Sequence, residues 1–196
     1  MTPSPHRCMP YWRLAGAAMA ILFNADVAAV ADTMTSPYAG QENRAIKALS
    51  EREMADLLAG RGMGYALAAE LNHYPGPSHA IELADKLNLS PEQRVLVQEV
   101  FITMQSRTKA IGAEIVSAEQ KLDTAFAAAT IEPTSLIAQT EILGQLYGRV
   151  RATHLAAHLE MKKLLTPQQI TVYDQLRGSS ATSTAAPTTP HNHDHP

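Results

Sequence analysis

The sequence contains one cysteine, Cys8, among its 196 residues. A chain with a single thiol forms no disulfide within itself, and oxidising compartments permit disulfides without requiring them. If the N-terminal segment that carries Cys8 is removed, as predicted below, no thiol remains. Catalysis by a thiolate and zinc sites built on cysteine are then excluded.

Strand patterns are also missing. The alternating runs of Val, Ile and Thr between turn residues that are typical of β-strands do not occur. Apolar residues recur instead at helical spacing, and aromatic residues make up only 5% of the chain. The sequence therefore predicts an all-α protein with a core built mainly from Ala and Leu. It carries no catalytic signature, and we expect a protein that is not an enzyme.

Long apolar runs are absent, apart from residues 14–23. Arg7 and Arg13 precede this run, and Ala29-Val30-Ala31 follows it as a cleavage site of small residues. We interpret residues 1–31 as a signal peptide for export. The alternative is a retained membrane anchor, but a membrane span needs roughly 20 apolar residues. After cleavage, we expect no membrane span.

The rest of the chain is mildly acidic. Residues 1–31 carry two arginines and one aspartate, so their removal changes the formal charge from −3 to −4. Nucleic acid is not expected as a partner, because phosphate binding needs a basic surface. We expect a loose N-terminal arm over residues 32–49 and a helical domain over residues 50–177. Residues 178–196, rich in Ser, Thr, Ala and Pro, are predicted to be a disordered tail.

Helix-start signals divide the helical domain. Ser50 with Glu53 forms a capping box that opens a helix running towards Leu71. Residues 72–77 then break the chain with two prolines and a glycine. Ser78 is expected to cap a short helix from His79 to about Leu87.

Two related signals follow, Leu89-Ser90-Pro91-Glu92-Gln93 and Leu165-Thr166-Pro167-Gln168-Gln169. In each motif Ser or Thr is the N-cap, proline takes the first helical position and glutamine completes the capping box. The first motif predicts a helix over residues 91–129, which a turn at 131–134 separates from a helix over 135–165. The second motif predicts a short last helix that ends near Leu176.

The two long helices are expected to form an antiparallel hairpin flanked by the shorter helices. Their apolar positions recur about every 3.5 residues, as in a coiled-coil-like pair. The predicted seam is Val97, Met104, Thr108, Ile111, Ile115, Ala118, Leu122 and Phe126 in the first helix, and Leu143, Tyr147, Val150, His154, Ala157, Met161 and Leu164 in the second. Because so thin a structure buries little surface, we expect it to form a homodimer.

The paired motifs resemble those of the Spy/CpxP (LTxxQ-motif) family of bacterial periplasmic proteins, which includes CnrX/ZraP-like heavy-metal resistance proteins. The resemblance covers about residues 75–177. It implies an all-α, cradle-shaped homodimer in the periplasm, with unfolded periplasmic proteins or a membrane sensor protein as partners. The family is divided between chaperoning, signalling and metal binding, so the resemblance leaves the function open.

His154, His158 and Met161 share one face of the second long helix. Side chains four residues apart can reach one ion, and imidazole suits zinc, copper and nickel whereas a thioether favours copper(I). Metal-resistance members of the family place His and Met just upstream of the second motif, which implies a metal role for these three residues. Sensor members also carry a His-x-x-x-His pair near the start of the domain, which this sequence lacks. The alternative is that His154 and Met161 pack in the seam and His158 is half-exposed.

Other candidates are weaker. His79 and Glu82 lie three residues apart and either complete a metal site or form a solvated surface pair. His191, His193 and His195 in the tail are expected to bind metal without geometric selectivity. Glycines 60, 62 and 64 follow no strand and lack a phosphate-loop ending, so we interpret them as a joint or a close helix approach.

Two functions are therefore left open. The first is a metal-binding protein of heavy-metal or envelope stress, based on the His/Met face and the tail. The second is an ATP-independent chaperone or stress-signalling adaptor without a metal site. It would hold unfolded clients on apolar patches rimmed by charges such as Arg107, Lys109 and Arg151.

Overall fold

The computed structural model describes residues 36–178, and those from Tyr38 onward belong to one compact unit. A short 3-10 helix, Gln41–Asn43, precedes six α-helices. The α-helices are α1 (Glu51–Ala59), α2 (Leu67–Glu70), α3 (Pro77–Glu82), α4 (Pro91–Ala127), α5 (Pro133–Leu164) and α6 (Pro167–Leu176). No strand occurs within the described residues, which confirms the all-α prediction. The predicted signal peptide and the tail histidines lie outside the described residues.

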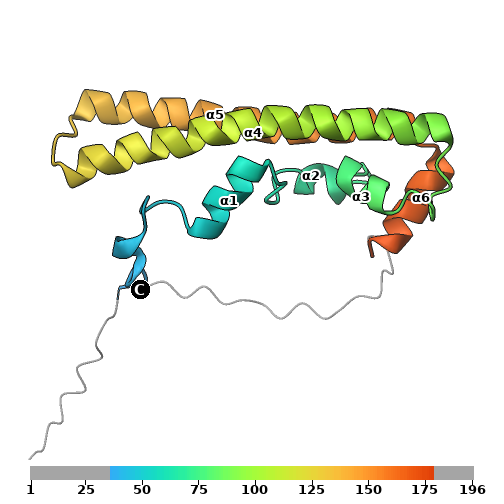
Figure 1. The fold of residues 1–196 in the computed structure, drawn as a ribbon, viewed down its shortest axis with the longest axis horizontal. Coiled ribbons are helices and arrows are strands. Elements are labelled where there is room, and N and C mark those ends of the chain that lie inside the picture. The colour runs from blue at the N-terminus through green and yellow to red at the C-terminus, as the bar shows by residue number, and fades with distance from the viewer. Residues whose placement is uncertain (1–35, 179–196) are drawn as a thin grey trace, which may run out of the picture. The chain divides into compact units, whose positions relative to one another are not determined.

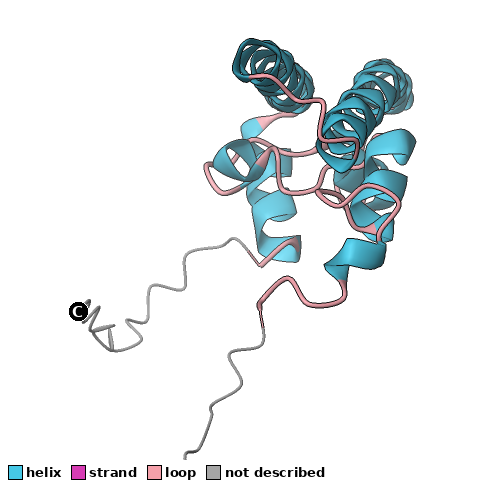
Figure 2. Ribbon diagram, turned by 90° about the vertical axis from the view of Figure 1, so that its left-hand side faces the viewer, coloured by secondary structure: helices cyan, strands magenta, loops and turns pink. Residues whose placement is uncertain are grey.

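The two long helices form the upper layer of this unit. The chain reverses at residues 128–132, so that α4 and α5 lie side by side (Figure 1). Helices α1, α2 and α3 pack on one face of the α4–α5 pair, as the end-on view in Figure 2 shows. Helix α6 folds back beneath the pair next to α3 (Figure 1).

The predicted capping boxes are formed. In α1, α4 and α6 the N-caps Ser50, Ser90 and Thr166 each accept a hydrogen bond from the backbone of the third helical residue. The side chain of that residue accepts a hydrogen bond from the N-cap backbone in return. These three starts are local in sequence, which is why the sequence predicts them.

Helices α1 and α3 differ from the prediction. Helix α1 ends at Ala59 instead of running to Leu71, because Gly60 adopts a left-handed conformation with φ of 66°. A Cβ atom on Gly60 would lie 2.6 Å from Oγ1 of Thr108, so the glycine allows a close approach to α4. Helix α3 begins at Pro77, with Gly76 rather than Ser78 as its N-cap, and ends at Glu82 rather than Leu87.

The core has two clusters. One lies where α3, α6 and the motif-bearing ends of α4 and α5 meet, around Val97, Met161 and Tyr173. The other joins α1 to the middle of the α4–α5 pair and contains Ile46 and Leu49. The predicted loose arm is therefore wrong at its C-terminal end, because these two apolar side chains are buried against the long helices.

The predicted seam of α4 is buried from Val97 to Ile115, but it is not buried near the C-terminal end of the helix. Phe126 is 55% exposed, and Ile137 and Ile142 of α5 are exposed near the same turn. None of the helices α1, α2, α3 and α6 reaches this end of the α4–α5 pair (Figure 1). Two helices alone bury too little surface to enclose all their apolar positions.

Candidate metal-binding cavity

His154 and His158 of α5 both line one cavity of about 460 Å³. Their exposed fractions are only 3% and 7%, so the alternative with a half-exposed His158 is wrong. The glycine-rich residues 60–64, α2 and the start of α3 form one side of the cavity, and Phe101 and Met104 of α4 form another. The cavity thus lies between the two layers, where the short helices cover α5.

The ring of His158 is held in one orientation. Its Nδ1 lies 2.7 Å from the backbone oxygen of Tyr74. Since a carbonyl oxygen only accepts hydrogen bonds, Nδ1 donates to it, and in the neutral tautomer Nε2 keeps its lone pair. A Cβ atom on Gly76 would lie 3.3 Å from Nε2 and 3.1 Å from Cε1, so glycine keeps this side of the ring free of a side chain.

The carboxylate of Glu70 in α2 lies close to the same ring. Its Oε2 lies 3.7 Å from Nδ1 of His158. Its Oε1 accepts hydrogen bonds from the Tyr173 hydroxyl at 2.7 Å and from Nε of Arg177 at 3.3 Å. Burial, followed by the hydrogen bond to Glu70, raises the pKa of Tyr173 well above its usual range, so the phenol stays protonated. The carboxylate is thus already engaged by α6.

His154 has a different environment. Its ring stacks on Tyr65, with centroids 5.9 Å apart and planes inclined at 21°. Burial, and then the charge of a protonated His158, hold the pKa of His154 below its usual value, and a hydrogen bond with the Arg61 backbone acts in the opposite direction. Its Nε2 is buried and has no hydrogen-bond partner. A buried polar nitrogen without a partner costs free energy, which a ligand at Nε2 would recover.

The fold separates Met161 from the two histidines of the predicted His/His/Met face. Met161 is fully buried in the cluster of Val97 and Tyr173 and does not line the cavity. The methionines that line it are Met104 of α4 and Met63 of the glycine-rich segment. The sequence pattern placed Met104 in the seam but did not indicate that it shares a cavity with the histidines.

The weaker candidates are only partly brought together. His79 lines the cavity, and its Nδ1 lies 3.3 Å from Oε2 of Glu82, which is not part of the lining. His73 pairs with Asp174 at 2.8 Å, away from the cavity. Within residues 36–178 no group of three or more His, Cys, Asp or Glu side chains is placed to hold a metal ion. Of the candidate ligands in this part of the chain, His79, His154 and His158 line the cavity.

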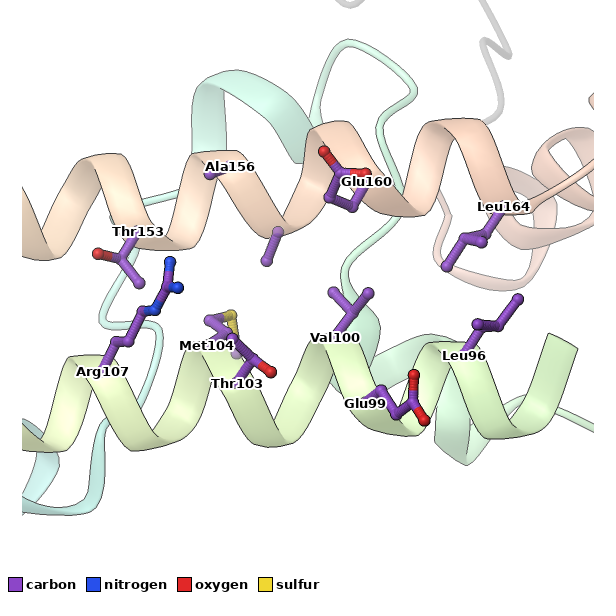
Figure 3. A pocket seen from close by; sticks show the side chains of 11 residues that line it. Leu96, Glu99, Val100, Thr103, Met104, Arg107, Thr153, Ala156, Glu160 and Leu164 are labelled. Carbon is purple, nitrogen blue, oxygen red and sulfur yellow. The ribbon is translucent and has the colours of Figure 1, made fainter.

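A second hollow lies between α4 and α5 (Figure 3). This groove has a volume of about 470 Å³, and Leu96, Val100 and Leu164 supply apolar surface. Glu99, Arg107 and Glu160 add charges to the lining. Of the three basic residues expected to rim an apolar patch, Arg107 lines the groove, whereas Lys109 and Arg151 do not.

No protein-family model, curated protein or solved structure matches the chain. The resemblance to the Spy/CpxP family therefore stays a prediction from the paired motifs. Among the helices of residues 36–178, none is both long and apolar enough to cross a membrane.

Proposed function

We propose that the chain is a non-enzymatic protein that binds a transition-metal ion in the cavity through Nε2 of His154 and Nε2 of His158. One observation carries this proposal. Two buried histidines, one helical turn apart, line the same cavity, and the buried Nε2 of His154 has no protein partner. Zinc, copper and nickel are the ions that such imidazole ligands suit.

The surroundings of the histidines support this role. Metal-binding histidines usually donate their other ring N–H to a carbonyl or a carboxylate, which fixes the tautomer and makes the free nitrogen a better donor. Nδ1 of His158 donates to the Tyr74 carbonyl at 2.7 Å, and the Glu70 carboxylate lies 3.7 Å from the same nitrogen. The lowered pKa of His154 keeps its imidazole neutral near pH 7, as metal binding requires.

The setting that we propose is the periplasm under heavy-metal or envelope stress. The signal-like residues 1–31 and the resemblance to the Spy/CpxP family support it. In this setting the protein is an antiparallel helical-hairpin dimer, and His191, His193 and His195 of the tail bind ions loosely. We also propose a membrane sensor protein as a binding partner in this setting.

Metal content after dialysis tests the proposal. The reference protein is the full chain, processed as in the cell, with the tail changes His191→Ala, His193→Ala and His195→Ala. We expect one zinc, nickel or copper ion per chain, lost in the His154→Ala/His158→Ala variant but kept in His79→Ala. A reference protein that retains no ion, or a double variant that retains as much, would rule out this site.

The groove in Figure 3 favours a second function, the holding of unfolded protein clients. It combines apolar surface with charges of both signs, and Leu96 at its edge is 43% exposed. Such patches mark sites of protein interaction. The protein should then suppress aggregation of a denatured substrate without ATP. Leu96→Glu should abolish the effect and Val95→Glu, at an exposed position outside the groove, should not.

A further inference from the structure

Met104 lines the cavity that contains the two histidines, and it is the residue that also lines the groove of Figure 3. We propose that the thioether of Met104 is the third donor of the metal site and that the site selects copper(I) over zinc(II). This inference rests on the proposed function, because it uses the same two histidines. It replaces Met161, the methionine that the sequence pattern favours, with one from the facing helix.

The donor set supports a soft ion. Two imidazole nitrogens and one thioether sulfur are neutral ligands, and a thioether binds copper(I) in preference to harder divalent ions. Met104 is mostly buried and is carried by a long helix, whereas Met63 is partly exposed on the glycine-rich segment. A flexible, polarisable side chain on a rigid helix can adjust its sulfur to the ion without moving the backbone.

The charges around the cavity also favour copper(I) over a divalent ion. The lining contains Arg177 and Arg61, the latter paired with Asp56, but only one carboxylate, Glu70. That carboxylate already accepts hydrogen bonds from Tyr173 and Arg177. No uncommitted anion of the lining is left to compensate a divalent ion. The cost of transferring an ion from water into the protein rises with the square of its charge, so the monovalent ion is favoured.

Met161 has no comparable access to an ion. Its side chain is completely buried among apolar residues such as Val97 and Leu165. Reaching the cavity would require it to leave this cluster and open a hole in the core, which is destabilising. Met161 is therefore the matched control for Met104, since both are buried methionines of the long helices.

The test measures copper(I) and zinc(II) affinity by competition with chelators of known affinity, under reducing conditions, on the reference protein without tail histidines. We expect copper(I) to displace zinc(II). Met104→Leu should weaken copper(I) binding at least about tenfold, a loss that even supporting residues of metal sites cause. The same change should leave zinc(II) affinity within about twofold, because imidazole alone suits zinc. Met161→Leu should alter neither affinity.

A spectroscopic readout of the reference protein identifies the sulfur donor directly, before any variant is compared. Copper K-edge X-ray absorption of the copper(I)-loaded reference protein should contain a sulfur scatterer that Met104→Leu removes and Met161→Leu retains. Scattering from nitrogen alone, or an unchanged copper(I) affinity in Met104→Leu, would overturn the inference while the histidine site stands. Metal binding that survives His154→Ala/His158→Ala would overturn the site and this inference together.

Discussion

Gln93 and Gln169, which are 76 residues apart, exchange a reciprocal pair of hydrogen bonds through their side-chain amides. Each Nε2 donates to the other Oε1 at 2.9 Å. Each Oε1 also accepts the backbone N–H of its own N-cap, Ser90 or Thr166. The two related sequence motifs therefore meet in space and join the start of α4 to the start of α6.

Glutamate at position 93 should break this connection but keep the local cap. Gln93→Glu retains an oxygen for the Ser90 backbone, but it removes the N–H that donates to Gln169 and to the Leu164 backbone oxygen at 2.9 Å. We expect the free energy of unfolding to fall by about 1–3 kcal/mol, the cost of leaving partly buried partners unsatisfied. Urea unfolding measures it. Gln168→Glu, at the exposed neighbouring position, should change stability by less than about 0.5 kcal/mol.

Gly112 is expected to control the contact between α1 and α4. A Cβ atom there would lie 2.1 Å from the backbone oxygen of Leu57, so Gly112→Ala has to push α1 away. We expect a loss of about 3 kcal/mol in thermal or urea unfolding, at the upper end for overpacking. Gly144→Ala is the matched control, because Gly144 of α5 has nothing within 4 Å of its Cβ position. Alanine there should raise stability by about 0.5–1 kcal/mol, and equal effects of the two changes would contradict the packing.

His154 should make the protein less stable in mild acid. Its pKa is lowered in the folded state, chiefly by burial, so the folded chain binds fewer protons than the unfolded chain as the pH falls. The free energy of unfolding should therefore decrease once the pH drops below about 6.5, the ordinary pKa of histidine. The His154→Phe variant keeps an aromatic ring against Tyr65 and should lose less stability between about pH 7.5 and 5.5. Identical pH profiles of the two proteins would show that His154 is not responsible.

Gly76 should be needed for ligand access to His158. Its backbone, with φ of −85° and ψ of 142°, accepts any residue, so the effect of a substitution comes from the space that its side chain fills. In Gly76→Ala the methyl group would lie 3.1 Å from Cε1 of His158 and 3.2 Å from Oε2 of Glu70. We expect metal affinity to fall about tenfold, as for other residues that support metal ligands.

The control for Gly76 is Gly62→Ala. Gly62 lines the same cavity but has nothing within 4 Å of its Cβ position. Its alanine variant should bind metal as the reference protein does in an equilibrium titration. A Gly76→Ala variant with unchanged affinity would show that the space beside the ring of His158 is not needed for metal binding.

The local parts of this fold were predictable from the sequence. The caps at Ser50, Ser90 and Thr166 depend on residues three positions apart, so the motifs alone determine them. The interpretation of Gly60 as a joint or a close helix approach is confirmed, because Gly60 ends α1 and lies against Thr108 of α4, although the predicted helix ran on to Leu71. The packing of Ile46 and Leu49 was not predictable, because it has no periodic pattern to indicate it.

The sequence predicted only part of the candidate site, the histidine pair. His154 and His158 could be paired because they lie four residues apart on one helix. The groups that orient His158 come from far away in the chain, such as the Tyr74 carbonyl, 84 residues distant. Met104 and Met161 both occupy seam positions, and periodicity alone cannot tell which of them faces a cavity. That difference depends on where the short helices cover the long ones.

The most direct measurement of the central claim is nitrogen NMR of the imidazole side chains during addition of zinc(II) or copper(I). The reference protein without tail histidines is labelled at the histidine ring nitrogens. The account predicts that Nε2 of His154 and Nε2 of His158 shift together, saturating at one ion per chain, while Nδ1 of His158 keeps its proton. Shifts confined to His73 or His79, or no shift at His154 and His158, would contradict it.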